Sequence, residues 1–164
     1  MGQMKSKILV VLGLMAFLGV GLTGYATADT EGTVNATVTA QQVAMSVTES
    51  LVEYGVLNIG DTDQVPNPAF FAANNDGNVP VDFVIRGFDT AAWTLAGSVG
   101  ADQYIHRFAT DGGTSFTALT TTPVTLSSVA VSGSQTVHLN LDMPDSTAAT
   151  ASQNADVKVL ATAS

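Results

Sequence analysis

The sequence predicts an all-β protein, specifically an antiparallel immunoglobulin-like β-sandwich of about nine or ten short strands. Three observations lead to this prediction. Apolar and polar residues alternate with a period close to two along most of the chain after residue 33. Turn-forming residues interrupt these runs about every eight to twelve residues, and no run has the spacing of an amphipathic helix. A jelly-roll arrangement of the strands is the alternative topology.

Each expected strand is a short run in which apolar residues fall on alternate positions. Thr33–Thr39 is a clear example, because valine or alanine alternates there with threonine or asparagine. Asn74–Asn78 consists of residues that tolerate left-handed conformations, so it predicts a tight turn. The Thr-, Ser- and Ala-rich stretch 145–154 is expected to be a loop. The expected strands are residues 33–39 with their continuation 43–47, and then 51–59, 70–73, 79–87, 92–96, 104–108, 116–119, 124–126, 137–141 and 157–160.

Residues 1–28 have the three parts of a cleavable signal peptide. Lys5 and Lys7 supply the positive charge, and an uncharged apolar run follows over residues 8–22. The sequence Ala26-Thr27-Ala28 then places small residues where a signal peptidase cleaves. The apolar run is shorter than the roughly 20 residues that a membrane-spanning helix needs. We therefore expect a protein that is secreted or held at the cell surface, with an uncleaved N-terminal anchor as the alternative.

Cleavage after Ala28 leaves residues 29–164 as a single, strongly acidic domain. The whole chain has 14 acidic and 5 basic residues, a net charge of −9. Loss of Lys5 and Lys7 leaves 3 bases and a net charge of −11 (3 − 14). Nucleic-acid binding is not expected, because it needs clustered Lys and Arg, and the same repulsion disfavours an anionic membrane. The chain has no cysteine, which favours a prokaryotic source over a eukaryotic secreted module.

The sequence carries no motif that indicates catalysis. There is no G-x-S-x-G, H-E-x-x-H or S-x-x-K arrangement. His106 and His138 lie in separate expected strands without a companion Cys or His, so a zinc site is not expected. Glycosidases use a pair of carboxylates, and the sequence has acidic residues close together. These pairs fall mostly in expected turns, so we interpret them as solvent-exposed acids rather than as catalytic residues. These pairs are Asp61 with Asp63 and Asp142 with Asp145. We expect a protein that is not an enzyme, with no catalytic, cofactor-binding or metal-ligating residue assigned.

Two features leave narrower alternatives open. Calcium is the metal that fits the composition best, because it prefers carboxylate, amide and backbone oxygens. Asp61-Thr62-Asp63 and Asn74–Asn78 offer such oxygens, although neither matches an EF-hand loop. Trp93 is the only tryptophan. A buried core position is its default interpretation, and an exposed platform for stacking sugars is the alternative.

Three segments resemble recurrent features of bacterial and archaeal immunoglobulin-like surface domains. They are Tyr54–Leu57 with Gly60, Asn74–Val81, and Gly133–Val137 with Pro144. The plan of a signal peptide followed by an acidic, cysteine-free sandwich without a catalytic motif is similar to that of secreted fibre subunits of the TasA and camelysin type. This resemblance implies a structural subunit. Trp93-Thr94-Leu95 looks like the W-x-L motif of WxL cell-wall-binding domains, whose second motif is absent here.

Two functions are therefore expected from the sequence. The first is a structural subunit of an extracellular fibre or surface layer, in which residues 29–47 include an exchangeable strand. The alternating segment Thr33–Val47 would complete a neighbour's sheet, because an unpaired strand needs a partner; pairing within its own subunit is the alternative. The second function is a cell-wall or glycan-binding module that acts through its loops or through Trp93.

Overall fold

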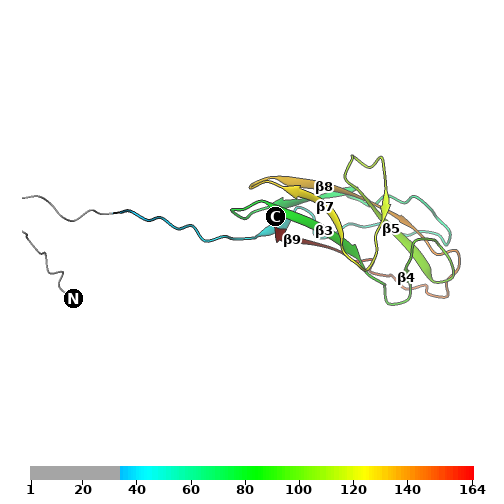
Figure 1. Cartoon of the computed structure of the whole chain (residues 1–164). Coiled ribbons are helices and arrows are strands. Elements are labelled where there is room, and N and C mark those ends of the chain that lie inside the picture. Colours follow the sequence, from blue (N-terminus) through cyan, green and yellow to red (C-terminus); the bar gives the residue numbers. More distant parts are fainter. Residues whose placement is uncertain (1–33) are drawn as a thin grey trace, which may run out of the picture. The chain divides into compact units, whose positions relative to one another are not determined.

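Two β-sheets and no helix make up the described part of the chain, which is residues 34–164 of a computed structural model (Figure 1). The all-β prediction is therefore confirmed for these residues. Within them, no helix is long and apolar enough to cross a membrane. The chain divides into two units between Thr39 and Ala40, so residues 34–39 and Ala40–Ser164 are described separately. The expected signal peptide, residues 1–28, lies outside the described residues.

The larger sheet has six strands and is mixed rather than purely antiparallel. Its strands, in order, are β1 (Met45–Val47), β2 (Phe70–Asn75), β8 (Ser134–Asp142), β5 (Gln103–Ala109) and β4 (Thr94–Leu95), and β6 (Thr117–Ala118) also pairs with β5. Only the β4–β5 pair is parallel. The expectation of a wholly antiparallel structure is wrong here, because residues 96–102 return the chain to the start of β4 before β5 begins.

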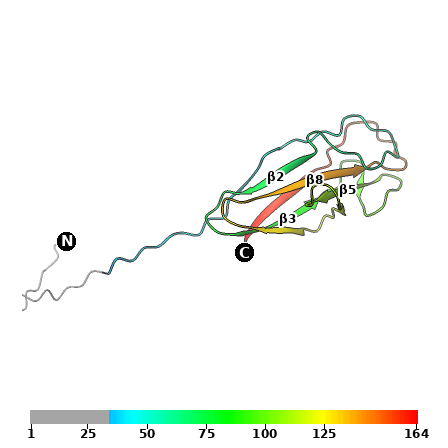
Figure 2. The ribbon, with the colours of Figure 1, turned by 90° about the horizontal axis from the view of Figure 1, so that it is seen from above.

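The smaller sheet has three strands, with β3 in the middle (Figure 2). Its strands are β7 (Val124–Val129), β3 (Val81–Gly87) and β9 (Val157–Ala163). β3 pairs with β9 in unbroken antiparallel register. The register of β3 with β7 shifts between Phe83 and Val84, which marks a β-bulge. β9 is therefore a regular edge strand, whereas β7 is an irregular one.

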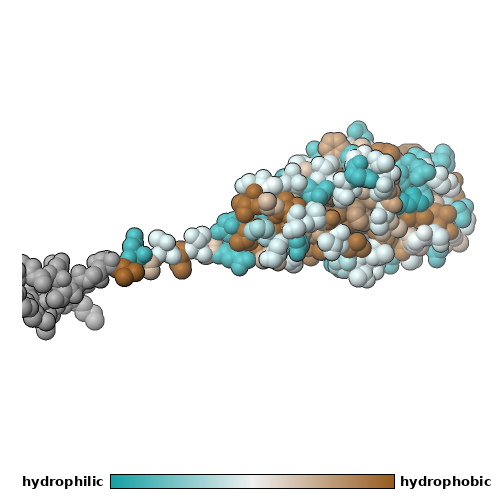
Figure 3. All heavy atoms as spheres, turned by 45° about the horizontal axis from the view of Figure 1, so that its top comes forward, coloured by the Kyte–Doolittle hydropathy of each residue, from teal (hydrophilic) through white to brown (hydrophobic). Residues whose placement is uncertain are grey.

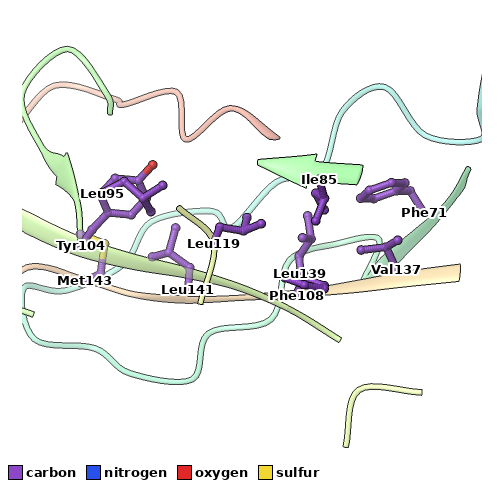
Figure 4. Close-up of a cluster of buried hydrophobic side chains, with 10 residues drawn as sticks. All are labelled: Phe71, Ile85, Leu95, Tyr104, Phe108, Leu119, Val137, Leu139, Leu141 and Met143. Atoms are coloured by element: carbon purple, nitrogen blue, oxygen red, sulfur yellow. The ribbon is translucent and has the colours of Figure 1, made fainter. Parts of the chain in front are cut away.

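The core fills the space between the two sheets. Ile85 of β3 points toward Val137 and Leu139 of β8, so both sheets contribute to one buried cluster (Figure 4). Every second residue of β3 is buried, which is the pattern that the period-two alternation predicts. The other members of this larger cluster are Phe71, Leu95, Tyr104, Phe108, Leu119, Leu141 and Met143. A smaller cluster consists of Ala73, Val81, Phe83 and Val129.

Two of the expected strands are absent. Residues 51–59 form only an isolated bridge, between Glu53 and Asn67. Val52, Tyr54 and Leu57 pack against the larger cluster instead, so their apolar pattern is satisfied by packing rather than by a partner strand. Gly55 interrupts the run with a φ of 71°. The prediction of a strand over residues 33–39 is also wrong for residues 34–39, the part that the structure describes, because these residues have no strand structure.

Candidate functional site

The asparagine-rich turn between β2 and β3 holds the segment that precedes β1. The Gln42 N–H donates to the side-chain oxygen of Asn78 at 2.7 Å, and the Asn78 N–H donates to the Gln42 carbonyl at 3.1 Å. The side-chain amide of Asn78 also donates to the Ala40 carbonyl at 2.7 Å. The Asp76 N–H donates to the Ala44 carbonyl at 3.0 Å. The chain from Ala40 to the end of β1 is therefore hydrogen-bonded to its own subunit.

Asn75 is the buried anchor of the same turn, with only 1% of its surface exposed. Its Nδ2 donates to the carbonyls of Val79, Val129 and Ala130 at 2.9, 3.2 and 3.1 Å. Its Oδ1 accepts a hydrogen bond from the Gly77 N–H at 3.0 Å. This side chain ties the turn to the end of β7. The turn that the sequence offered as a calcium loop thus uses the amides of two asparagines for structural hydrogen bonds.

β1 is an edge strand whose inward face is apolar. Val47 lies opposite the fully buried Ala73 of β2, and paired residues of antiparallel strands project from the same face. Met45 precedes Val47 by two residues, so it projects to the same side. Val43 lies just before β1, where hydrogen bonds to the Gln42 and Ala44 carbonyls continue the pairing, so its side chain follows the same alternation. We call Val43, Met45 and Val47 the apolar strip. Met45 is half-buried against the smaller cluster, but Val43 and Val47 remain 41% and 40% exposed.

Residues 34–39, the described part of the other unit, keep their apolar side chains exposed. Val34 is 89% exposed and Val38 is 98% exposed. Apart from Val131, every large apolar side chain that is exposed in the described part of the chain lies between Val34 and Phe70. Figure 3 shows brown residues separated by paler and teal ones where the chain follows the grey residues. The exposed apolar surface of residues 34–164 is therefore concentrated toward the N-terminal side of the sequence.

A partly buried ion pair on the outer face of the larger sheet was not foreseen from the sequence. Arg107 Nη1 donates to Asp142 Oδ1 at 2.7 Å and to Asn140 Oδ1 at 3.0 Å, and Nη2 pairs with Asp142 Oδ2. The Asp63 N–H donates to Asp142 Oδ1 at 2.8 Å. Burial alone raises the pKa of Asp142, but the hydrogen bonds from Arg107 and Asp63 outweigh it and hold that pKa below its usual range. This arrangement stabilises the sheet and leaves the Asp142 carboxylate fully occupied.

The remaining candidate acids do not form a metal site. Asp61 Oδ2 accepts hydrogen bonds from the backbone N–H and the side-chain amide of Asn58, at 2.7 and 3.2 Å, which closes a turn. The Asp63 carboxylate lies 3.6 Å from Arg107 Nη1, and Asp145 is exposed. Among residues 34–164, no group of three or more His, Cys, Asp or Glu side chains is placed to hold a metal ion.

The two histidines lie on opposite faces of the larger sheet. His106 is buried in the core, and its Nε2 is hydrogen-bonded to the Tyr54 hydroxyl at 2.9 Å. Burial lowers the pKa of His106 to about 4, so the ring is neutral near pH 7. His138 is half-buried on the outer face, where its ring lies 5.2 Å from that of Phe70. The structure therefore does not bring the two histidines together.

Trp93 is a packing residue rather than a free platform. It is half-buried against the larger cluster, and its ring centroid lies 6.2 Å from that of Tyr104. Its Nε1 donates to Thr147 Oγ1 at 3.1 Å, which ties β4 to the loop before β9. Leu95, the other apolar residue of the W-x-L sequence, is buried in the core. These contacts fit the core interpretation of Trp93.

Sequence reasoning missed the polar residues whose partners are distant in the chain. Arg107 and Asp142 are 35 positions apart, and Tyr54 and His106 are 52 apart. Their separation gives no periodic signal: the sheet register brings Arg107 to Asp142, and packing of residues 51–59 on the core brings Tyr54 to His106. Comparison with protein-family models, with curated proteins and with solved structures found no match.

Proposed function

We propose that this chain is an exported, non-enzymatic structural protein of the cell surface or extracellular matrix. In this proposal its mature part is an immunoglobulin-like β-sandwich, and copies assemble into a fibre by β-strand addition. The observation that carries the proposal is the segment 34–39, whose residues alternate as in a strand but have no strand structure and leave Val34 and Val38 exposed.

The first support is the exposed apolar face of this segment. Burying a valine side chain contributes about 1.5–3 kcal/mol, so burying both Val34 and Val38 against a partner contributes about 3–6 kcal/mol. Strand addition would also satisfy the backbone N–H and carbonyl groups of the segment. An exposed alternating strand that stayed unpaired would be an aggregation hazard.

The second support is the distribution of charge. The mature chain would carry a net charge of −11, so two copies repel each other over most of their surface. Residues 33–47 contain no charged side chain. A second acidic copy that approaches through this segment therefore meets no charged side chain of the segment itself.

The third support is the boundary of the segment. Residues 40–47 are hydrogen-bonded to their own subunit, as described above. An exchangeable strand would therefore end at about Thr39, rather than at Val47 as the sequence alone suggests. Removal of residues 34–39 spares all these hydrogen bonds.

The test is electron microscopy of the mature protein, starting at Asp29, beside a variant that lacks residues 34–39. The proposal expects ordered fibres from the first protein and monodisperse particles from the second. Urea unfolding checks the fold of the shortened variant, which should still unfold in one cooperative transition because residues 34–39 lie in no strand. Monodisperse particles from the intact mature protein across protein concentrations and pH values would contradict the proposal.

A further inference from the structure

The smaller sheet has an open, regular edge beside the apolar strip. β9 is the last strand of the order β7-β3-β9, so its outer edge pairs with no other strand of the described residues. Val159 and Ala161 of β9 pack against the smaller cluster, and Met45 of the apolar strip packs against the same cluster. The edge of β9 and the apolar strip on β1 therefore border the same end of the core.

Burial falls sharply from β3 to β9. The inward side chains of β3, Val81, Phe83 and Ile85, are completely buried. The inward side chains Val159 and Ala161 of β9 are only half-buried. The apolar strip is also incompletely covered, with Val43 and Val47 each about two-fifths exposed. One more strand beside β9 would cover both sets of side chains.

The other edge of the smaller sheet is less suitable. The register between β3 and β7 shifts at Phe83, whereas the register between β3 and β9 is unbroken from Val81 to Gly87. A bulge twists an edge strand and interrupts the ladder that an added strand would extend. Charge does not separate the two edges, because β7 carries no charged residue and β9 carries only Lys158, near its start.

We propose that the edge of β9 and the apolar strip accept residues 34–39 of a second copy of this chain. The added strand would turn Val34, Ala36 and Val38 inward, over the apolar strip, and Asn35, Thr37 and Thr39 outward. The six residues span about 20 Å, close to the roughly 23 Å of the seven-residue β9. This inference rests on the proposed function, because it names the surface that receives the exchanged strand.

Disulfide trapping tests the inference, since the chain has no cysteine of its own. Single variants Val34→Cys, Ala36→Cys and Val38→Cys of the mature protein are each mixed with Ala161→Cys under mild oxidation. At least one of these three positions in the inserted segment should form a disulfide-linked heterodimer with Ala161→Cys, because side chains of neighbouring strands come within disulfide reach. Thr37→Cys is the matched control in the inserted segment. It should form no heterodimer with Ala161→Cys, because its side chain would face outward.

Leu126→Cys is the matched acceptor control. Leu126 is also half-buried and packs against the smaller cluster, but it lies on β7, the opposite edge of the same sheet. If the donor cysteines form heterodimers with Leu126→Cys and not with Ala161→Cys, the choice of β9 is overturned while strand exchange stands. If the proteins stay monomeric and no pair forms a heterodimer, the proposed function and this inference both fail.

Discussion

Replacing Asn75 by alanine should destabilise the fold more than its place in a turn suggests. Asn75→Ala removes four hydrogen bonds and takes this partner from the Val79 and Val129 carbonyls and the Gly77 N–H, whereas the Ala130 carbonyl still accepts from the Gly133 N–H. Each lost bond costs about 1 kcal/mol, and more where the abandoned group stays buried. The bond to the Val129 carbonyl is buried and the others are partly buried, so we expect a loss of about 3–4 kcal/mol in the free energy of unfolding.

Urea unfolding at pH 7 measures this loss, and the neighbouring residue provides the control. Asn74 is more exposed, and its side chain makes one long hydrogen bond, to Ser46 Oγ at 3.3 Å, so Asn74→Ala should cost less than about 1 kcal/mol. Asn75→Asp should cost at least as much as Asn75→Ala, because a carboxylate would face three carbonyl oxygens without a donor. Equal unfolding midpoints for Asn75→Ala and Asn74→Ala would refute the reasoning that Asn75 anchors the turn.

Two further predictions concern the core. The folded pKa of His106, about 4, lies below its ordinary value of 6.5, so the fold should have its full stability above pH 6.5 and lose up to about 3 kcal/mol as the pH falls toward 4. Urea midpoints measured across this pH range give the dependence of stability on pH, which His106→Gln should flatten. An unchanged pH dependence in His106→Gln would contradict the assignment of this loss to His106. Gly87→Ala places a Cβ 2.6 Å from Leu95 Cδ2 and should cost about 1–3 kcal/mol by overpacking. Gly97→Ala meets no atom within 4 Å and should leave the urea midpoint nearly unchanged, so equal midpoints for the two glycine variants would count against the packing around Gly87.

The strands were largely predictable because one face of each is buried. The alternation of Val81, Phe83 and Ile85 records which side chains meet the core, and the expected strand over 79–87 differs from β3 only at its first two residues. The same signal misled at residues 51–59, where Val52 and Tyr54 alternate and pack on the core but lie in no strand. Periodicity reports which side chains are buried, and it does not report whether the backbone finds a partner strand.

The candidate site was predictable only in part. The alternating segment near the N-terminus was visible in the sequence. The sequence did not show that its part from Ala40 onward is held by its own subunit, because the hydrogen bonds between Gln42 and Asn78 join residues 36 positions apart. The roles of Asn75 and of the Arg107–Asp142 pair were hidden for the same reason. Both depend on which strands are neighbours, and alternation along one strand carries no information about its neighbours.

Sedimentation velocity on three forms of the mature protein tests the central claim, that copies assemble through the apolar face of residues 34–39. The double variant Val34→Asp/Val38→Asp places two charges on that face, and Thr37→Asp/Thr39→Asp places the same two charges on the opposite face of the same segment. We expect the wild-type protein and the threonine variant to assemble, whereas the valine variant should sediment as a folded monomer that unfolds in one cooperative urea transition. Assembly of the valine variant to the same extent as the wild-type protein would contradict the central claim.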